Sequence, residues 1–116
     1  MDTAPTTTLP TQRYANQYLY SDILPFEVTR VVSERTIDVR RMTSVRDPSW
    51  KPEIIPGGFA GHCTNNSEQR WLFESDATFN TTRIRRSKKG ANLWRDKYGN
   101  NYVLSDVPRR FHDYNF

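Results

Sequence analysis

Two neighbouring stretches of this chain alternate apolar and polar residues, with a short polar turn between them. The first is FEVTRVVS at residues 26–33, and the second is TIDVRRM at residues 36–42. Successive side chains of a β-strand point to opposite faces, so a period of two indicates strands with one buried face. The pair predicts a β-hairpin in which Ile37 and Val39 face inward, while Asp38 and Arg40 face solvent.

Shorter stretches of the same character follow at residues 70–74, 82–86, 92–95 and 102–105. The last two are joined through DKYGNN, where Gly99 permits the positive φ that a tight connection requires. Helical periodicity is scarce throughout. We therefore expect a mostly β fold, a small antiparallel β-barrel or sandwich of the SH3-like or OB-like kind, with an α+β fold as the fallback.

The chain of 116 residues is long enough for one modest core, and its aromatic content of 13% predicts that large rings dominate it. The first twelve residues are mainly Thr and Pro with few apolar groups, so they cannot offset the entropy of ordering. We expect a flexible arm over residues 1–20 and a single β-rich domain over residues 21–116. Phe111, Tyr114 and Phe116 predict that the C-terminus docks on that domain.

Positive charge is concentrated in one part of the sequence. Residues 83–97 hold seven bases and one acid, a net +6, whereas the whole chain carries only +4. A focused positive surface attracts phosphates and acidic partners, although basic residues also simply solvate strand faces. Ile84 is expected to point inward and Arg83 and Arg85 outward. The residues expected to contact anions are Arg83, Arg85, Arg86, Arg95 and Lys97, with Tyr98 as the preferred exposed aromatic group.

A glycine-rich stretch, WKPEIIPGGFAGHCTNN at residues 50–66, holds three of the five glycines, the only Cys and one of two His. A connection this long without regular structure is usually functional or disordered, and its apolar residues, including Ile54 and Ile55, predict anchoring to the core. Pro56-Gly57 has the signature of a type II turn. We predict an ordered functional loop with Trp50, Gly57, Gly58, Phe59, Gly61, His62 and Asn65 as its key residues.

A small Cys/His enzyme is an alternative interpretation of this loop. His62, Cys63 and His112 would be its catalytic residues, and Asn65 or Asn66 would orient an imidazole. Adjacent side chains in an extended segment point apart, which makes His112 the better partner for Cys63. A buried Cys also serves as a small hydrophobe. No metal site and no cofactor are predicted, because no Cys-x-x-Cys pair, no nucleotide-binding glycine motif and no clear carboxylate pair is present.

Four stretches of the chain resemble a family of short uncharacterised proteins from tailed bacteriophages and prophages: FEVTRVVS, WKPE, PGGFAGHCTN and the ending DYNF. The resemblance extends from about residue 26 to the end and carries no known activity. It implies a phage accessory protein that acts inside a bacterium.

These features together predict a non-enzymatic binding protein. The expected partner is nucleic acid or an acidic host protein, and an adaptor that inhibits a host protein is a further alternative. A single Cys, no leader sequence and no apolar run of membrane-spanning length predict the bacterial host cytoplasm and no membrane partner. Edge strands of a small sheet make a homodimer possible.

Overall fold

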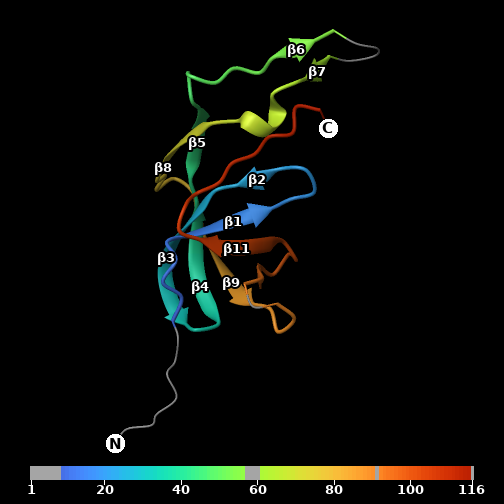
Figure 1. Ribbon diagram of the computed structural model, residues 1–116. Coiled ribbons are helices and arrows are strands. Elements are labelled where there is room, and N and C mark those ends of the chain that lie inside the picture. Colours follow the sequence, from blue (N-terminus) through green and yellow to red (C-terminus); the bar gives the residue numbers. More distant parts are fainter. Residues whose placement is uncertain (1–8, 57–60, 91, 116) are drawn as a thin grey trace, which may run out of the picture.

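Within residues 9–56, 61–90 and 92–115, which the computed structural model describes, six antiparallel strands close into a barrel (Figure 1). The barrel order is β11-β10-β9-β4-β3-β1, and β1 pairs with β11 to close it. The short strand β2 (Ile23–Leu24) also pairs with β1. The mostly β prediction is thus confirmed. The barrel strands are β1 (Tyr14–Tyr18), β3 (Phe26–Ser33), β4 (Thr36–Arg41), β9 (Thr81–Arg86), β10 (Trp94–Arg95) and β11 (Asn101–Ser105).

The barrel interior is filled by the residues that the alternation assigned to it. Ile37 and Val39 of β4 and Ile84 of β9 are fully buried. The ring of Phe26 meets that of Tyr102 edge to face, with 5.2 Å between centroids, a favourable geometry for aromatic pairs. The remaining members of this core are Ala15, Trp94 and Leu104.

The predicted boundary of the N-terminal arm is wrong. Residues 14–18 form β1, which pairs with β11 from Tyr14 opposite Ser105 to Tyr18 opposite Asn101. Ala15, Asn16 and Gln17 are buried. The sequence did not predict this strand because its buried residues include polar ones. The Asn16 amide is hydrogen-bonded to the backbone of Val107 and Arg109 rather than to water. Residues 1–8 lie outside the described part of the chain.

A smaller layer lies above the barrel in Figure 1. β5 (Thr43–Arg46) follows β4 almost directly and pairs with β8 (Trp71–Glu74). β6 (Ile54–Ile55) pairs with β7 (His62–Cys63), and a 3-10 turn spans Asn66–Glu68. The stretch at residues 50–66 therefore contains regular structure that the sequence did not predict.

The prediction that apolar residues anchor the stretch 50–66 to the core is only partly confirmed. Trp50 is buried, but Ile54 and Ile55 are each about half exposed, at 52% and 51%. Gly61 allows a close approach, because an added Cβ would lie 2.4 Å from Cγ2 of Ile54. Gly57, Gly58 and Phe59, with the turn expected at Pro56-Gly57, fall outside the described residues. No helix in the described residues is long and apolar enough to cross a membrane.

Replacing Ile84 with Ala tests the barrel core. The substitution removes a fully buried side chain, so we expect the free energy of unfolding to fall by about 2–5 kcal/mol. Urea denaturation followed by tryptophan fluorescence measures it. Leu72→Ala, at a side chain that is half exposed, is the control and should change stability by less than about 0.5 kcal/mol. Equal losses in the two variants would contradict the assignment of the core.

Candidate anion-binding face

Arg83 and Arg85 project from the outer face of β9, because Ile84 between them points into the core. Arg95 of β10 lies directly opposite Arg85 in the antiparallel register. Directly opposed residues present their side chains on the same face with Cβ atoms about 5 Å apart. The sequence correctly predicted that Arg83 and Arg85 face outward, and the register adds Arg95 beside Arg85.

These three arginines differ in how they are paired. Arg83 makes a two-point contact with Asp38, with Nε 2.9 Å from Oδ1 and Nη2 3.3 Å from Oδ2. The hydrogen bond from Arg83 lowers the pKa of Asp38, and the same pair raises the pKa of Arg83. Arg95 donates instead to the neutral Asn101, with its Nε 3.0 Å from Oδ1. Among the described residues, neither Arg85 nor Arg95 has a carboxylate within 4.0 Å.

The turn between β10 and β11 is organised by Asp96. Its carboxylate accepts hydrogen bonds from the backbone N–H groups of Tyr98 and Asn100, from the Asn100 amide and from the Tyr102 hydroxyl, at 2.8–3.0 Å. Burial opposes ionisation, but these hydrogen bonds outweigh it and lower the pKa of Asp96. Gly99 adopts a φ of 85°, as the turn prediction required. The turn is thereby fixed by the carboxylate.

This fixed turn presents Lys97 and Tyr98 at the surface. The Lys97 Nζ atom lies 5.1 Å from the centre of the Tyr98 ring, and the Tyr98 side chain is 76% exposed. Together with β9 the turn encloses a cleft of about 390 Å³, a size typical of ligand sites. Its lining residues are Thr81, Thr82, Arg83, Arg85, Lys97 and Tyr98.

Arg86 does not join this face, which corrects the prediction of one five-residue cluster. It follows Arg85 on β9 and therefore points to the other side of the sheet, beside Trp94 opposite it on β10. There it lines a separate basic hollow of about 230 Å³ at the β9–β10 turn. Strand alternation divides the basic segment in two. The lining residues of this second hollow are Arg35, Arg86, Ser87, Lys88, Lys89 and Gly90.

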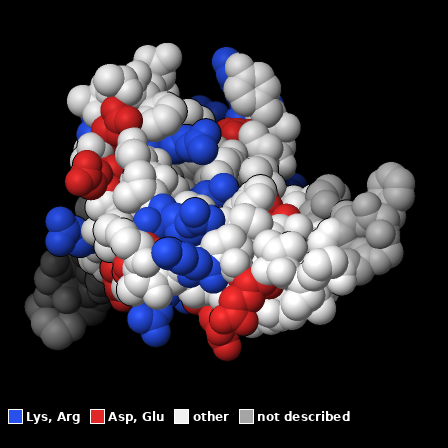
Figure 2. Space-filling model, turned by 90° about the horizontal axis from the view of Figure 1, so that it is seen from above, with Lys and Arg blue, Asp and Glu red and all other residues white. Residues whose placement is uncertain are grey.

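A third group of bases lies at the upper end of the molecule. Figure 2 shows Lys and Arg side chains gathered in the middle of that face, with Asp and Glu nearer its edges. Several bases of the segments that build this end contact their own chain. The Arg110 guanidinium stacks 5.0 Å from the Trp71 ring and donates to the carbonyls of Ile23 and Phe111, and Arg46 donates to the Tyr114 hydroxyl. The guanidinium groups of Arg110 and Arg46 therefore make contacts that stabilise the fold.

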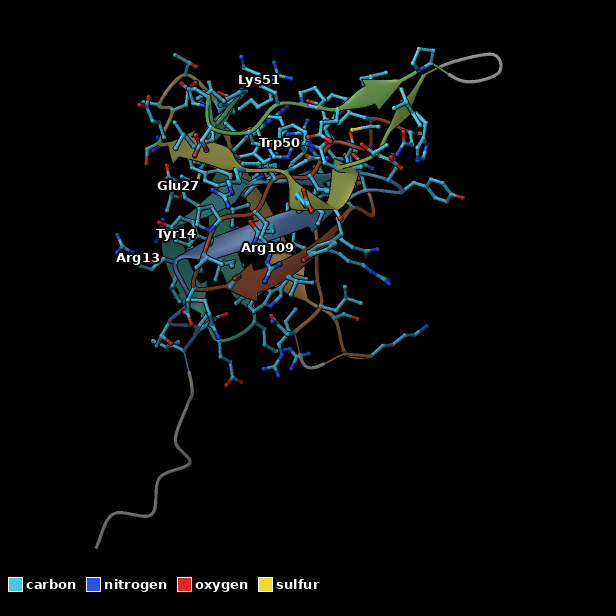
Figure 3. All side chains as sticks on the ribbon, turned by 45° about the horizontal axis from the view of Figure 1, so that its top comes forward. Arg13, Tyr14, Glu27, Trp50, Lys51 and Arg109 are labelled. Atoms are coloured by element: carbon cyan, nitrogen blue, oxygen red, sulfur yellow. The ribbon has the colours of Figure 1, made fainter. Side chains whose placement is uncertain are left out.

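Asn65 joins the two arms of the β6–β7 segment. Its amide oxygen accepts from the Glu53 N–H at 2.8 Å, and its amide nitrogen donates to the Lys51 carbonyl at 2.8 Å. Trp50 lies beneath this segment and packs on Tyr114, whereas Lys51 points outward at its top (Figure 3). Asn65 thus has a structural function in this loop.

The C-terminal segment docks along the loop, as predicted from Phe111 and Tyr114, whereas Phe116 lies outside the described residues. Gln69 and His112 exchange two hydrogen bonds, and the Asn66 amide donates to Asp113 at 3.0 Å. Asn115 accepts from the Cys63 N–H at 2.7 Å and donates to the Cys63 carbonyl at 3.0 Å. The Asn115 amide thus satisfies the backbone N–H and carbonyl of Cys63, as a neighbouring β-strand would.

The three residues of the enzyme alternative have separate surroundings. Cys63 is 2% exposed, and its thiol lies 3.4 Å from the Asn65 amide oxygen. His62 is exposed on the opposite side of β7. His112 lies 3.6 Å from Asp22 and edge-on to the Tyr114 ring. Cys63 thus contacts amides, which do not activate a thiol as a base or cation would.

No three His, Cys, Asp or Glu side chains of the described residues come together in a way that holds a metal ion.

Several residues of the basic surfaces were not predicted from the sequence, namely Arg35, Thr81, Thr82 and Asp96. Asp96 was detectable as the first residue of a Gly-containing turn, where Asp commonly bonds the backbone two residues on. Arg35 had no such signal, because only the pairing of β4 with β9 brings it close.

No protein-family model, curated protein or solved structure matches this chain.

Asp96→Asn tests the turn. The substitution weakens four hydrogen bonds to a carboxylate, so we expect a loss of about 1–3 kcal/mol at pH 7. A carboxyl whose pKa is lowered by folding stabilises the protein fully above its unfolded pKa of about 3.9 and stops doing so as pH falls through the folded value. The stability deficit should therefore shrink below about pH 4. Urea titrations at several pH values measure it. Asp106→Asn is the exposed control, and parallel pH profiles for wild type and Asp96→Asn would contradict the role.

Asn115→Ala tests the C-terminal docking. It removes both hydrogen bonds to the Cys63 backbone, and at about 1 kcal/mol each their loss favours local opening. We expect alkylation of the Cys63 thiol to accelerate by about thirtyfold, the factor that about 2 kcal/mol provides, measured by mass spectrometry. Asn80→Ala, in the exposed turn before β9, should leave the rate unchanged. An unaltered rate in Asn115→Ala would show that other contacts keep Cys63 closed.

Proposed function

We propose that this protein is a phage-type accessory binding protein that holds nucleic acid on the outer face of β9, β10 and the β10–β11 turn. The observation that carries the proposal is the cleft in which Arg85 and Lys97 meet an exposed aromatic ring. Neither cation is within 4.0 Å of a carboxylate among the residues described. Arginine suits two-point contact with phosphate, and aromatic rings beside basic groups suit bases.

The phage assignment and the place of action have a different support. The resemblance of the loop and C-terminal sequences to phage and prophage proteins supports both the proposed phage origin and the proposed place of action, the cytoplasm of the bacterial host. Nucleic acid is favoured over an acidic protein because the cleft combines cations with an aromatic face, whereas an acidic peptide requires only the cations.

Removing the two cations tests the proposal. We expect labelled 12-nucleotide DNA and RNA to bind wild type and to bind Arg85→Ala/Lys97→Ala far more weakly. For a single strand the slope of log K against log salt should flatten by about 0.7 for each phosphate that the variant no longer neutralises. Fluorescence anisotropy at about 50 mM and about 200 mM salt measures both quantities.

Arg13→Ala is the matched control. Arg13 is exposed and directly precedes β1 at Tyr14, the end of that strand remote from Asn101 (Figure 3). Its loss should leave affinity and salt slope unchanged. Absence of nucleic-acid binding at the lower salt concentration would overturn the proposal, as would tighter binding of polyglutamate than of nucleic acid.

A further inference from the structure

We propose that the ligand is a single strand, with one base stacked on Tyr98 and the backbone crossing β9, β10, β11 and β1 toward Tyr18. This inference rests on the proposed function and narrows its substrate class. The bases of a duplex are stacked on one another, so their faces are not free for a protein ring. A single strand offers those faces to exposed aromatic groups.

Tyr98 has the properties of a stacking platform. Its ring is three-quarters exposed although its backbone is fixed by the N–H bond to Asp96. Binding therefore costs little ordering of the main chain, while a large apolar surface leaves water. Lys97 lies against the same ring, where its charge can meet a phosphate beside the stacked base. Base stacking on an aromatic ring contributes about 1–3 kcal/mol per base.

The register of the barrel strands sets the direction that the bound nucleic acid takes beyond the cleft. Arg85 is opposite Arg95, Arg95 is opposite Asn101, and Asn101 is opposite Tyr18. Opposed residues share a face, so these four side chains form one row on the outside of the barrel. Two cations, an amide and a second aromatic ring, 39% exposed, thus follow each other across four strands.

The length of this row limits the size of the site. Neighbouring strands are about 4.8 Å apart, so three steps from Arg85 to Tyr18 cover about 14 Å. With the cleft at one end, the row accommodates on the order of four nucleotides, the lower end of the range for small barrels. The row offers aromatic faces and phosphate contacts but no set of base-edge donors, so binding should be tolerant of sequence.

Tyr98→Ala separates stacking from charge. The probes are a uridine 12-mer, an abasic 12-mer with the same phosphates, and a 12-base-pair duplex. Wild type should bind the uridine 12-mer about tenfold more tightly than the abasic strand or the duplex, as one stacked base provides. Tyr98→Ala should strongly reduce that preference while still binding the abasic strand, and Tyr98→Phe should keep it. A second readout is photocrosslinking of 5-iodouridine RNA to Tyr98, mapped by mass spectrometry.

The two proposals fail in different ways. An unchanged preference for the uridine strand over the abasic strand in Tyr98→Ala, or duplex binding as tight as single-strand binding, would overturn this inference and leave the nucleic-acid function standing. If wild type bound none of the probes, the proposed nucleic-acid function itself would be overturned. Thermal unfolding of each variant verifies that the exposed substitution has left the barrel intact.

Discussion

The pairing of β1 with β11 is the constraint on which the rest of the structure depends. It joins residues 14–18 to residues 101–105 and turns an open sheet into a closed barrel. A closed sheet has an inside and an outside, so each strand's alternation sends one set of side chains to the core and the other to the surface. The same pairing places Tyr18 beside Asn101 and so completes the exterior row that begins at Arg85. Without closure β11 would lie at one edge of an open sheet and β1 near the other edge, so Tyr18 would be far from Asn101 and Arg95.

A chain of hydrogen bonds connects the barrel interior to its surface. Gln17 donates to the Tyr102 hydroxyl at 3.0 Å, and that hydroxyl donates to Asp96 at 2.9 Å. Burial of Tyr102, together with its bond to the Asp96 carboxylate, raises the tyrosine pKa, so the phenol stays a donor. Asp96 in turn fixes the backbone that carries Tyr98. An exposed ring is therefore held by a polar network that reaches back to β1, which gives the surface turn some of the rigidity of the core.

Much of this fold could be predicted from periodicity, and the failures have a physical cause. Ile37, Val39 and Ile84 were correctly assigned to the core because alternation is a local signal. The arm over residues 1–20 was wrong because β1 buries Asn16 and Gln17, whose amides are satisfied by partners more than 80 residues away. The anchoring predicted for Ile54 and Ile55 was wrong for the opposite reason, since apolar residues gave no sign that, among the residues described, their short strand pairs with β7 alone. Arg86 was grouped with Arg83 and Arg85 by sequence, although strand alternation alone places it on the other face.

The charge density of the sequence does not by itself locate the anion site, because many of the bases are already engaged. Arg110 directs its donors to carbonyls and lies over an aromatic face, Arg46 donates to Tyr114, and Arg40 pairs with Glu27 at 2.8 Å. Such groups already have hydrogen-bonding partners within the fold, so a ligand gains less from them than from a cation without such hydrogen bonds. Arg85 and Lys97 remain beside a cleft with a fixed aromatic ring. Bases without a carboxylate partner among the described residues also line the hollow that contains Arg86, Lys88 and Lys89, but at this cleft they coincide with an exposed ring on which a base can stack.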